Sequence, residues 1–257
     1  MEQTIKLNKL ALISGADIHF EGIKLHVPTI KEFAEQDLDE QDIFHLLDIL
    51  LISKEKLGNT VPQTIEGFEV NNYLLFTTLV SNEVFIEQDG KKFNYFLELL
   101  FKNYTVSFSQ IGIILSDIGE TSFYIINDSN FEKFQKYLKE IFCLDKIFSN
   151  SEEEYNISEN DKKAKELAEK FKKRHQILND IKKKENGGDG SVIGSYISIL
   201  SVALGMPLET LINKTIYQIF YLLDRYTLYY ASDLDIKIKL AGGSSDGEQP
   251  DNWMKIT

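Results

Sequence analysis

Asp233 and Asp235 form the arrangement in this chain that comes nearest to a catalytic pattern. In an extended segment, residues two apart face the same side, and paired carboxylates hold the ions of two-metal hydrolases. No third carboxylate or histidine stands in a suitable register with this pair. A solvated position on a helix is therefore the favoured interpretation, and a metal-dependent hydrolase is the weakest of the functions considered.

Histidine and cysteine, the usual zinc ligands, are few and scattered. The four histidines show neither an HxxxH spacing nor a nearby cysteine pair: His19, His26, His45 and His175. Common zinc sites need such spacings, so we expect no metal site. The single cysteine, Cys143, excludes a disulfide within the chain, fits a reducing compartment and is expected in the core.

Two glycine clusters, Gly187–Gly190 and Gly242–Gly247, are interpreted as linkers. Neither follows a strand, and neither ends in the Gly-Lys-Ser/Thr of a phosphate-binding loop. The Gly-x-Ser-x-Gly turn of serine hydrolases is also missing from the sequence. The sequence therefore predicts a protein that is not an enzyme, with no catalytic residue and no cofactor.

The charge of the chain is acidic and unevenly distributed. Its 257 residues carry a formal charge of −12, which argues against a protein that coats phosphate backbones. The segment 161–185 has ten basic and five acidic residues, so it carries +5 and the remainder −17. Such a basic segment finds partners within its own acidic molecule or on another acidic copy.

The longest uncharged stretch, residues 190–208, is long enough to span a bilayer. Its serines, glycines and Pro207 make a buried helix the better interpretation. No signal-peptide pattern opens the sequence, so secretion by that route is not expected.

Hydrophobic periodicity and turn residues predict the elements of the first 150 residues. The expected strands are 5–13, 18–20, 23–27 and 121–126, with a hairpin turn at Glu21-Gly22. The expected helices are 42–57, 67–86, 92–100 and 131–147, with Val84–Ile86 as an alternative strand. Two capping boxes, Thr29 to Glu32 and Ser129 to Glu132, are expected to open helices.

The chain is accordingly expected to be a mainly helical α+β protein in three parts: a mixed domain (1–150), a charged and solvated helical connector (151–190) and an aromatic helical unit (191–257). In the last part, small residues recur at helical spacing (Ser191, Gly194, Ser195, Ser198, Ser201) opposite an aliphatic face (Ile193, Ile197, Leu200, Leu204). Both faces can pack, either inside a bundle or against another subunit.

Apolar residues cover more than one side of the helix expected from Thr215 to Tyr230. Such a helix must be buried on several sides, which implies a partner surface. The C-terminal segment that follows is short, acidic and glycine-rich, and it ends near the only tryptophan, Trp253.

The end of the chain resembles proteins encoded in the tail modules of tailed phages and prophages of low-GC Gram-positive bacteria. The resemblance lies in the order of Thr215–Gln218, Arg225, Asp233–Leu240, Ala241–Gly243 and Trp253–Ile256, about the last fifth of the chain. Two further stretches, Ile23–Glu32 and Phe123–Phe131, are similar more weakly. The spacer Gly243–Gly247 departs from the more charged spacer of those proteins.

The resemblance implies a tail assembly chaperone for tail tube and tape-measure protein, or a structural tail or baseplate part. Such a protein acts in the host cytoplasm during assembly or stays in the virion tail. Its expected partners are other phage tail proteins, with self-association as a further option, and neither membrane nor nucleic acid is expected. The expected partner-binding residues are Tyr217, Tyr221, Arg225, Trp253 and Met254. A DNA-associated phage factor using Lys162–Lys184 is the alternative.

Overall fold

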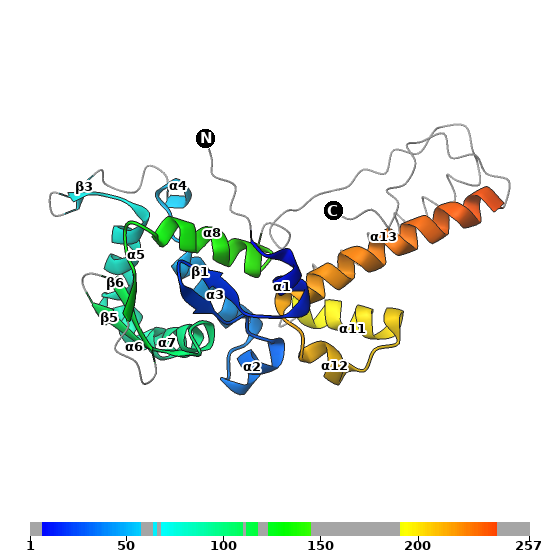
Figure 1. Cartoon of the computed structure of the whole chain (residues 1–257), viewed down its shortest axis with the longest axis horizontal. Helices are drawn as coiled ribbons and strands as arrows, with labels where there is room; N and C mark the ends of the chain where they lie inside the picture. The colour runs from blue at the N-terminus through cyan, green and yellow to red at the C-terminus, as the bar shows by residue number, and fades with distance from the viewer. Residues whose placement is uncertain are drawn as a thin grey trace. The chain divides into compact units, whose positions relative to one another are not determined.

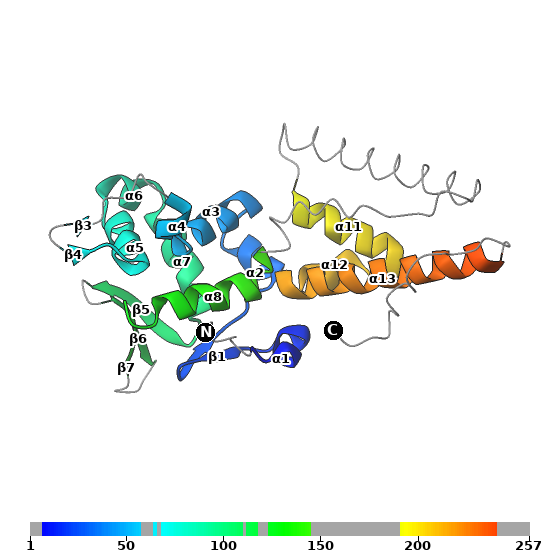
Figure 2. The same ribbon diagram turned by 90° about the horizontal axis from the view of Figure 1, so that it is seen from above.

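The computed structural model (Figures 1 and 2) describes residues 7–57, 64–65, 68–109, 112–117, 123–144 and 191–240. The chain divides into two compact units. Unit 1 contains Met1–Phe148 and Ile212–Gln218, and unit 2 contains Ser149–Leu211 and Ile219–Thr257. The expected connector, 151–190, lies outside the described residues.

Unit 1 combines short helices with small antiparallel sheets, in agreement with the predicted mainly helical α+β class. Its helices are α1 (Lys9–Ser14), α2 (Ile30–Glu35), α3 (Glu40–Leu50), α4 (Lys54–Leu57), α5 (Asn72–Val80), α6 (Glu83–Gln88), α7 (Gly90–Leu100) and α8 (Phe131–Ile141). Its strands are β1 (Ile18–Phe20), β2 (Ile23–Leu25), β3 (Thr64–Ile65), β4 (Phe68–Glu69), β5 (Tyr104–Ser109), β6 (Gly112–Asp117) and β7 (Phe123–Ile126).

The predicted hairpin of β1 and β2 is confirmed. Its turn residues, Glu21 and Gly22, have φ values of 48° and 85°, as a tight two-residue turn requires. The predicted capping box at the start of α2 is also confirmed. The Thr29 hydroxyl accepts from the Glu32 amide, and the Glu32 carboxylate accepts from the Thr29 amide at 2.9 Å.

Phenylalanine dominates the core of unit 1. The fully buried rings are Phe20, Phe33, Phe76, Phe93, Phe96, Phe101, Phe131, Phe134 and Phe142. They come from the hairpin β1–β2 and from several helices, and neighbouring rings stack or tilt against each other. Phe33 and Phe96, for example, have centroids 5.8 Å apart. Each buried ring removes a large apolar area from water, so these side chains contribute strongly to the stability of unit 1.

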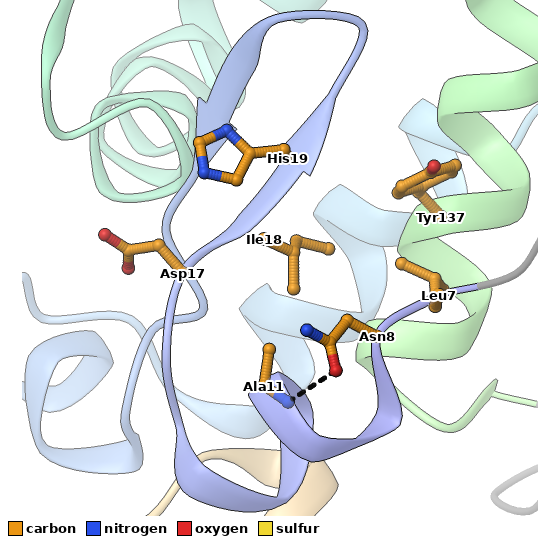
Figure 3. Close-up of a pocket in the computed structure, with 7 residues that line it drawn as sticks. All are labelled: Leu7, Asn8, Ala11, Asp17, Ile18, His19 and Tyr137. Atoms are coloured by element: carbon orange, nitrogen blue, oxygen red, sulfur yellow. Dashed lines mark hydrogen bonds between the residues drawn. The ribbon is translucent and has the colours of Figure 1, made fainter.

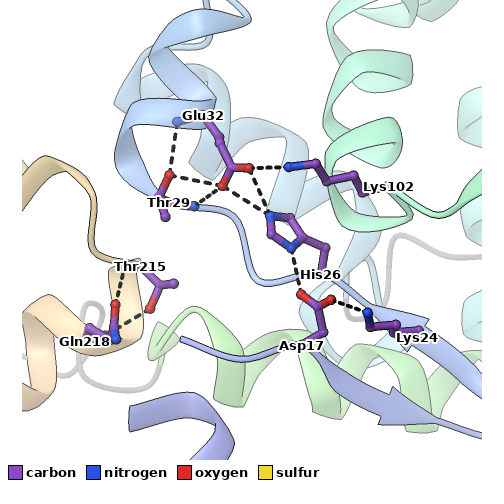
Figure 4. A network of polar contacts seen from close by, with 8 residues as sticks. All are labelled: Asp17, Lys24, His26, Thr29, Glu32, Lys102, Thr215 and Gln218. Atoms are coloured by element: carbon purple, nitrogen blue, oxygen red, sulfur yellow. Dashed lines mark hydrogen bonds and ion pairs between the residues drawn. The ribbon is translucent and has the colours of Figure 1, made fainter. Parts of the chain in front are cut away.

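A distant piece of chain, Ile212–Gln218, completes unit 1. Thr215 forms an isolated antiparallel bridge with Thr29, and the Ile30 amide donates to the Lys214 carbonyl at 3.0 Å. The Gln218 side chain donates to the Ile13 carbonyl at 2.9 Å and also caps Thr215 (Figure 4). The residues at which the resemblance begins are therefore part of the fold of unit 1.

Unit 2 consists, within the described residues, of α11 (Val192–Leu204), α12 (Leu208–Ile212) and α13 (Ile216–Leu240), whose ends partly belong to unit 1. Ser191 caps α11 by accepting from the Gly194 amide at 2.7 Å. Gly205 ends α11 with a φ of 63°, the left-handed conformation that glycine adopts without strain.

Several expectations for unit 1 are wrong. Residues 9–13 of the expected strand 5–13 belong to helix α1, because Asn8 caps this helix and Gly15 ends it with a φ of 72°. The expected helix 67–86 is divided into β4, α5 and α6, since Asn71 and Asn82 each cap a new helix. The alternative strand Val84–Ile86 is also helical, in α6.

Two further differences concern the region before α8. Strands β5 and β6 were not predicted, and they pair antiparallel with each other, with β7 on the far side of β6. The expected capping box at Ser129 is wrong, because the Ser129 hydroxyl donates to Asn127 instead.

Cys143 is buried as expected, but it lies in the turn after α8 with a φ of 51°.

Candidate partner-binding surface

Helices α11 and α13 pack through aliphatic and aromatic side chains. Ile193, Ile197 and Leu200 of α11 are buried. Tyr196 meets Phe220 of α13 edge-on, with ring centroids 5.4 Å apart. The aliphatic face of α11 is therefore the one that packs within unit 2.

The opposite face of α11 is exposed and carries no charged side chain. It presents Ser195, Ser198, Ile199 and Val202, and the Val202 side chain is 87% exposed. The two hydroxyls donate to backbone carbonyls of their own helix, Ser195 to Ser191 at 2.9 Å and Ser198 to Gly194 at 3.0 Å. We call these four residues the outer face of α11.

Helix α13 is much longer than the helix that accompanies it. Its 25 residues span about 37 Å, whereas the 13 residues of α11 span about 20 Å. Figures 1 and 2 show α13 continuing beyond the end of α11. Large side chains are exposed in the second half of α13: Tyr229 (53%), Tyr230 (38%) and Ile236 (53%). We call these three residues the α13 patch.

Three of the predicted partner-binding residues lie on α13. Tyr217 and Tyr221 are half-buried in its first two turns, and the Arg225 guanidinium lies 5.2 Å from the centre of the Tyr221 ring. Trp253 and Met254 lie outside the described residues. The structure thus brings Tyr221 and Arg225 together.

Sequence reasoning did not single out the α13 patch. Tyr229 and Ile236 are seven residues apart, which puts them on the same side of a helix. Tyr230 stacks on Tyr226 at 6.1 Å between ring centroids. The heptad spacing of Tyr229 and Ile236 could have been noticed in the sequence, but only the structure shows that these side chains are exposed.

A polar network lies in unit 1 between the hairpin β1–β2, α2 and the end of α7 (Figure 4). His26 is at its centre, with Nδ1 2.7 Å from Asp17 and Nε2 3.1 Å from Glu32. Lys24 pairs with Asp17 at 3.0 Å, and Lys102 pairs with Glu32 at 2.8 Å. Because both ring nitrogens of His26 are engaged, the imidazole is held as a structural link.

The carboxylates of this network have lowered pKa values. Burial by itself would raise the pKa of Glu32, but hydrogen bonds from Lys102, the Thr29 backbone and His26 outweigh burial and lower that pKa to about 2. For Asp17, burial again opposes the shift, while His26 and Lys24 lower the pKa. Both groups are therefore charged at neutral pH, and they hold the start of α2 in place.

A small cavity of about 170 Å³ lies beside α1 in unit 1 (Figure 3). Its lining residues are Leu7, Asn8, Ala11, Asp17, Ile18, His19 and Tyr137. Sites for small organic ligands usually start at about 300 Å³. The Asp17 carboxylate is already paired with His26 and Lys24. This cavity is therefore a poor candidate for a substrate site.

The metal ligands and paired carboxylates considered in the sequence analysis form no metal site in the part of the chain that the structure describes. No group of three or more His, Cys, Asp or Glu residues there could hold a metal ion. Positions 233 and 235 lie on the helix α13 and not on an extended segment, and Asp233 pairs with Lys237. Among the described helices, none is long and apolar enough to cross a membrane.

Comparisons with known proteins identify no relative. No family model, no curated protein and no solved structure matches this chain.

Proposed function

We propose that this protein is a non-enzymatic phage tail assembly factor that binds another tail protein through α13. The observation that carries the proposal is the α13 patch, whose three large side chains are exposed in the second half of α13. The resemblance of Thr215–Gln218, Arg225 and the C-terminal segment to tail-module proteins supplies the biological context.

The patch suits a helix-in-groove contact. Amphipathic helices bind apolar grooves through side chains at positions three, four and seven apart, and Tyr229 and Ile236 are seven apart. Tyrosine combines an apolar ring with a polar hydroxyl, and it provides a large contact area in a complex. Bound in this way, α13 would cover an apolar helical surface of a tail protein until assembly requires it.

The expected partner is the tape-measure or baseplate protein, and the expected place of action is the host cytoplasm. Trp253 and Met254 would extend the contact from the C-terminal segment. A structural role in the virion tail is the second candidate. Mass spectrometry of purified virions separates the two, since a chaperone leaves before maturation and a structural part stays.

The test is co-expression with the tape-measure, tail-tube and baseplate proteins of the same genome, followed by measurement of Kd for the complex that forms. Tyr229→Ala or Ile236→Ala should weaken binding by about 2 kcal/mol, or roughly 30-fold, while the Tm of the free protein stays unchanged. Val84→Ala is the matched control, because Val84 is an exposed apolar residue (58%) on α6 of unit 1.

Trp253→Ala is expected to behave like the two α13 variants, weakening the complex and leaving the free protein stable. Failure to form a complex with any of these tail proteins would refute the proposal. Equal weakening by Val84→Ala would move the binding site away from α13.

A further inference from the structure

The imidazole of His26 lies between two carboxylates in unit 1 (Figure 4). Its Nδ1 is 2.7 Å from Oδ1 of Asp17, and its Nε2 is 3.1 Å from both carboxylate oxygens of Glu32. The His26 side chain is only 16% exposed, and the His26 amide donates to the Leu100 carbonyl at 2.8 Å. The ring and its backbone are therefore both tied within unit 1.

These two ring contacts require two ring protons. A neutral imidazole has one N–H donor and one lone pair, whereas an imidazolium donates through both nitrogens. Asp17 and Glu32 have lowered pKa values, so at neutral pH both carboxylates accept hydrogen bonds and donate none. In either neutral tautomer of His26, one nitrogen lone pair would face a carboxylate oxygen. Only the charged form of His26 makes both contacts together.

The charged side chains around the ring come from four segments of unit 1. Asp17 precedes β1, Lys24 lies on β2, Glu32 lies on α2 and Lys102 follows α7. Lys24 pairs with Asp17 at 3.0 Å, and Lys102 pairs with Glu32 at 2.8 Å and has a raised pKa because of this hydrogen bond. Histidine is the residue type whose charge ordinarily changes between about pH 5 and 8. Within this network, His26 is therefore the group that can respond to pH in that range.

Glu32 connects the ring to the distant piece of chain Ile212–Gln218, which belongs to unit 1. Its Oε2 accepts from the Thr29 amide at 2.9 Å and from the Thr29 hydroxyl at 3.0 Å. Thr29 in turn forms the antiparallel bridge with Thr215, which is only 1% exposed. A neutral His26 would direct a lone pair at the same Glu32 carboxylate. The resulting repulsion would loosen the start of α2, where Ile212–Gln218 is held.

We propose that His26 is a pH-sensitive switch, which in its charged form holds Ile212–Gln218 at the start of α2 and on losing one ring proton loosens that contact. The Nδ1 contact with Asp17 is the shorter of the two, so the remaining proton stays on Nδ1 and the contact with Glu32 is lost. The stabilising contribution is present at low pH, where both nitrogens carry protons, and it decreases as the pH rises. The inference does not depend on the tail-assembly role.

Hydrogen exchange of the Ile30 amide tests this switch, because that amide donates to the Lys214 carbonyl at 3.0 Å. Its protection factor, in which the intrinsic pH dependence of exchange is divided out, should fall about tenfold in the full chain between about pH 5 and 8. The Leu51 amide, which donates to the Leu47 carbonyl at 2.8 Å, is the internal control and should keep its protection factor. His26→Gln and His26→Arg cannot lose a ring proton, so neither variant should show the fall at Ile30.

A constant protection factor of Ile30 in the wild type would overturn the proposal. A fall that persists in His26→Gln would also overturn it, because another group would then be responsible. An equal fall at Ile30 and Leu51 would do the same, by showing that pH changes the stability of the whole unit. His45→Gln is the matched histidine control, because His45 pairs with Asp89 at 3.2 Å and its side chain is 56% exposed. This variant should keep the fall at Ile30, and its loss there would contradict the assignment to His26.

Discussion

The substitution Glu32→Gln tests whether the His26 network stabilises unit 1 through charge. Glutamine can replace glutamate in a capping box, so the contact with the Thr29 amide is kept. What is lost is the negative charge that pairs with Lys102 and His26. The variant therefore separates the charge of Glu32 from its role as a cap.

The expected magnitude follows from the pKa. Glu32 has a pKa of about 2 in the folded protein, against an ordinary value of 4.5. This difference corresponds to roughly 3 kcal/mol of stability at neutral pH. The Glu32 side chain is 21% exposed, so solvent screening lowers the expected contribution to about 2 kcal/mol.

The sign follows from the direction of the shift. Because folding lowers the pKa, this contribution is fully present above about pH 4.5 and is lost as the pH falls towards 2. Wild type should exceed Glu32→Gln by about 2 kcal/mol in free energy of unfolding at pH 7, and the two should converge near pH 2. Asp17, whose pKa is also lowered, titrates in both proteins and largely cancels in the difference.

Urea unfolding at a series of pH values measures this difference directly. Glu35→Gln is the matched control, because Glu35 lies three residues after Glu32 on α2 and its side chain is 60% exposed. It should cost little at any pH. A constant difference between wild type and Glu32→Gln across the pH range would refute the electrostatic account.

Two further substitutions test packing. Gly15→Ala should cost about 2 kcal/mol, because φ is +72° and a Cβ would lie 3.0 Å from the Gln218 amide nitrogen. Gly205→Ala should cost only about 1 kcal/mol, since φ is +63° but no atom lies within 4 Å of the added Cβ. An equal decrease in the urea midpoint of the two glycine variants would contradict this reasoning. Gln135→Leu should cost about 2 kcal/mol, because the buried amide donates to the carbonyls of Leu50 and Ile52, both at 2.9 Å. Thermal unfolding of this variant at an unchanged Tm would contradict that role.

Local capping patterns were readable from sequence only where no other polar side chain competes. The Thr29–Glu32 box forms as predicted. The Ser129–Glu132 spacing is the same but fails, because Asn127 accepts from the Ser129 amide and hydroxyl. In addition, Asn130 accepts from the Asn127 amide, so asparagines organise this turn.

Strands were harder to predict than helices, because their stability comes from pairing partners elsewhere in the chain. The segment Tyr104–Ser109 alternates Tyr, Val and Phe with Thr or Ser, so the period-two signal of a strand was present in the sequence but was missed. It becomes a strand by pairing with β6, which places Val106 opposite Leu115. The apolar residues at 9–14, in contrast, suggested a strand, whereas the caps at Asn8 and Gly15 decide for a helix.

Only part of the candidate partner-binding surface could be predicted from the sequence. Sequence indicated an aromatic helix in the last third and two faces of α11 that could pack. It could not rank those faces, because an uncharged serine face and an aliphatic face both suit a helix interface. The structure buries Ile193, Ile197 and Leu200 and exposes Val202.

The sequence by itself determined the properties that depend on composition and near neighbours. These are the acidic charge, the mainly helical class, the hairpin at Glu21-Gly22 and the cap at Thr29. Only the tertiary structure decided that residues 212–218 belong to unit 1 and that α13, with 25 residues, is longer than α11, with 13. Contacts such as Thr29 with Thr215 join residues far apart in the chain, and their free energy comes from packing that no local spacing reveals.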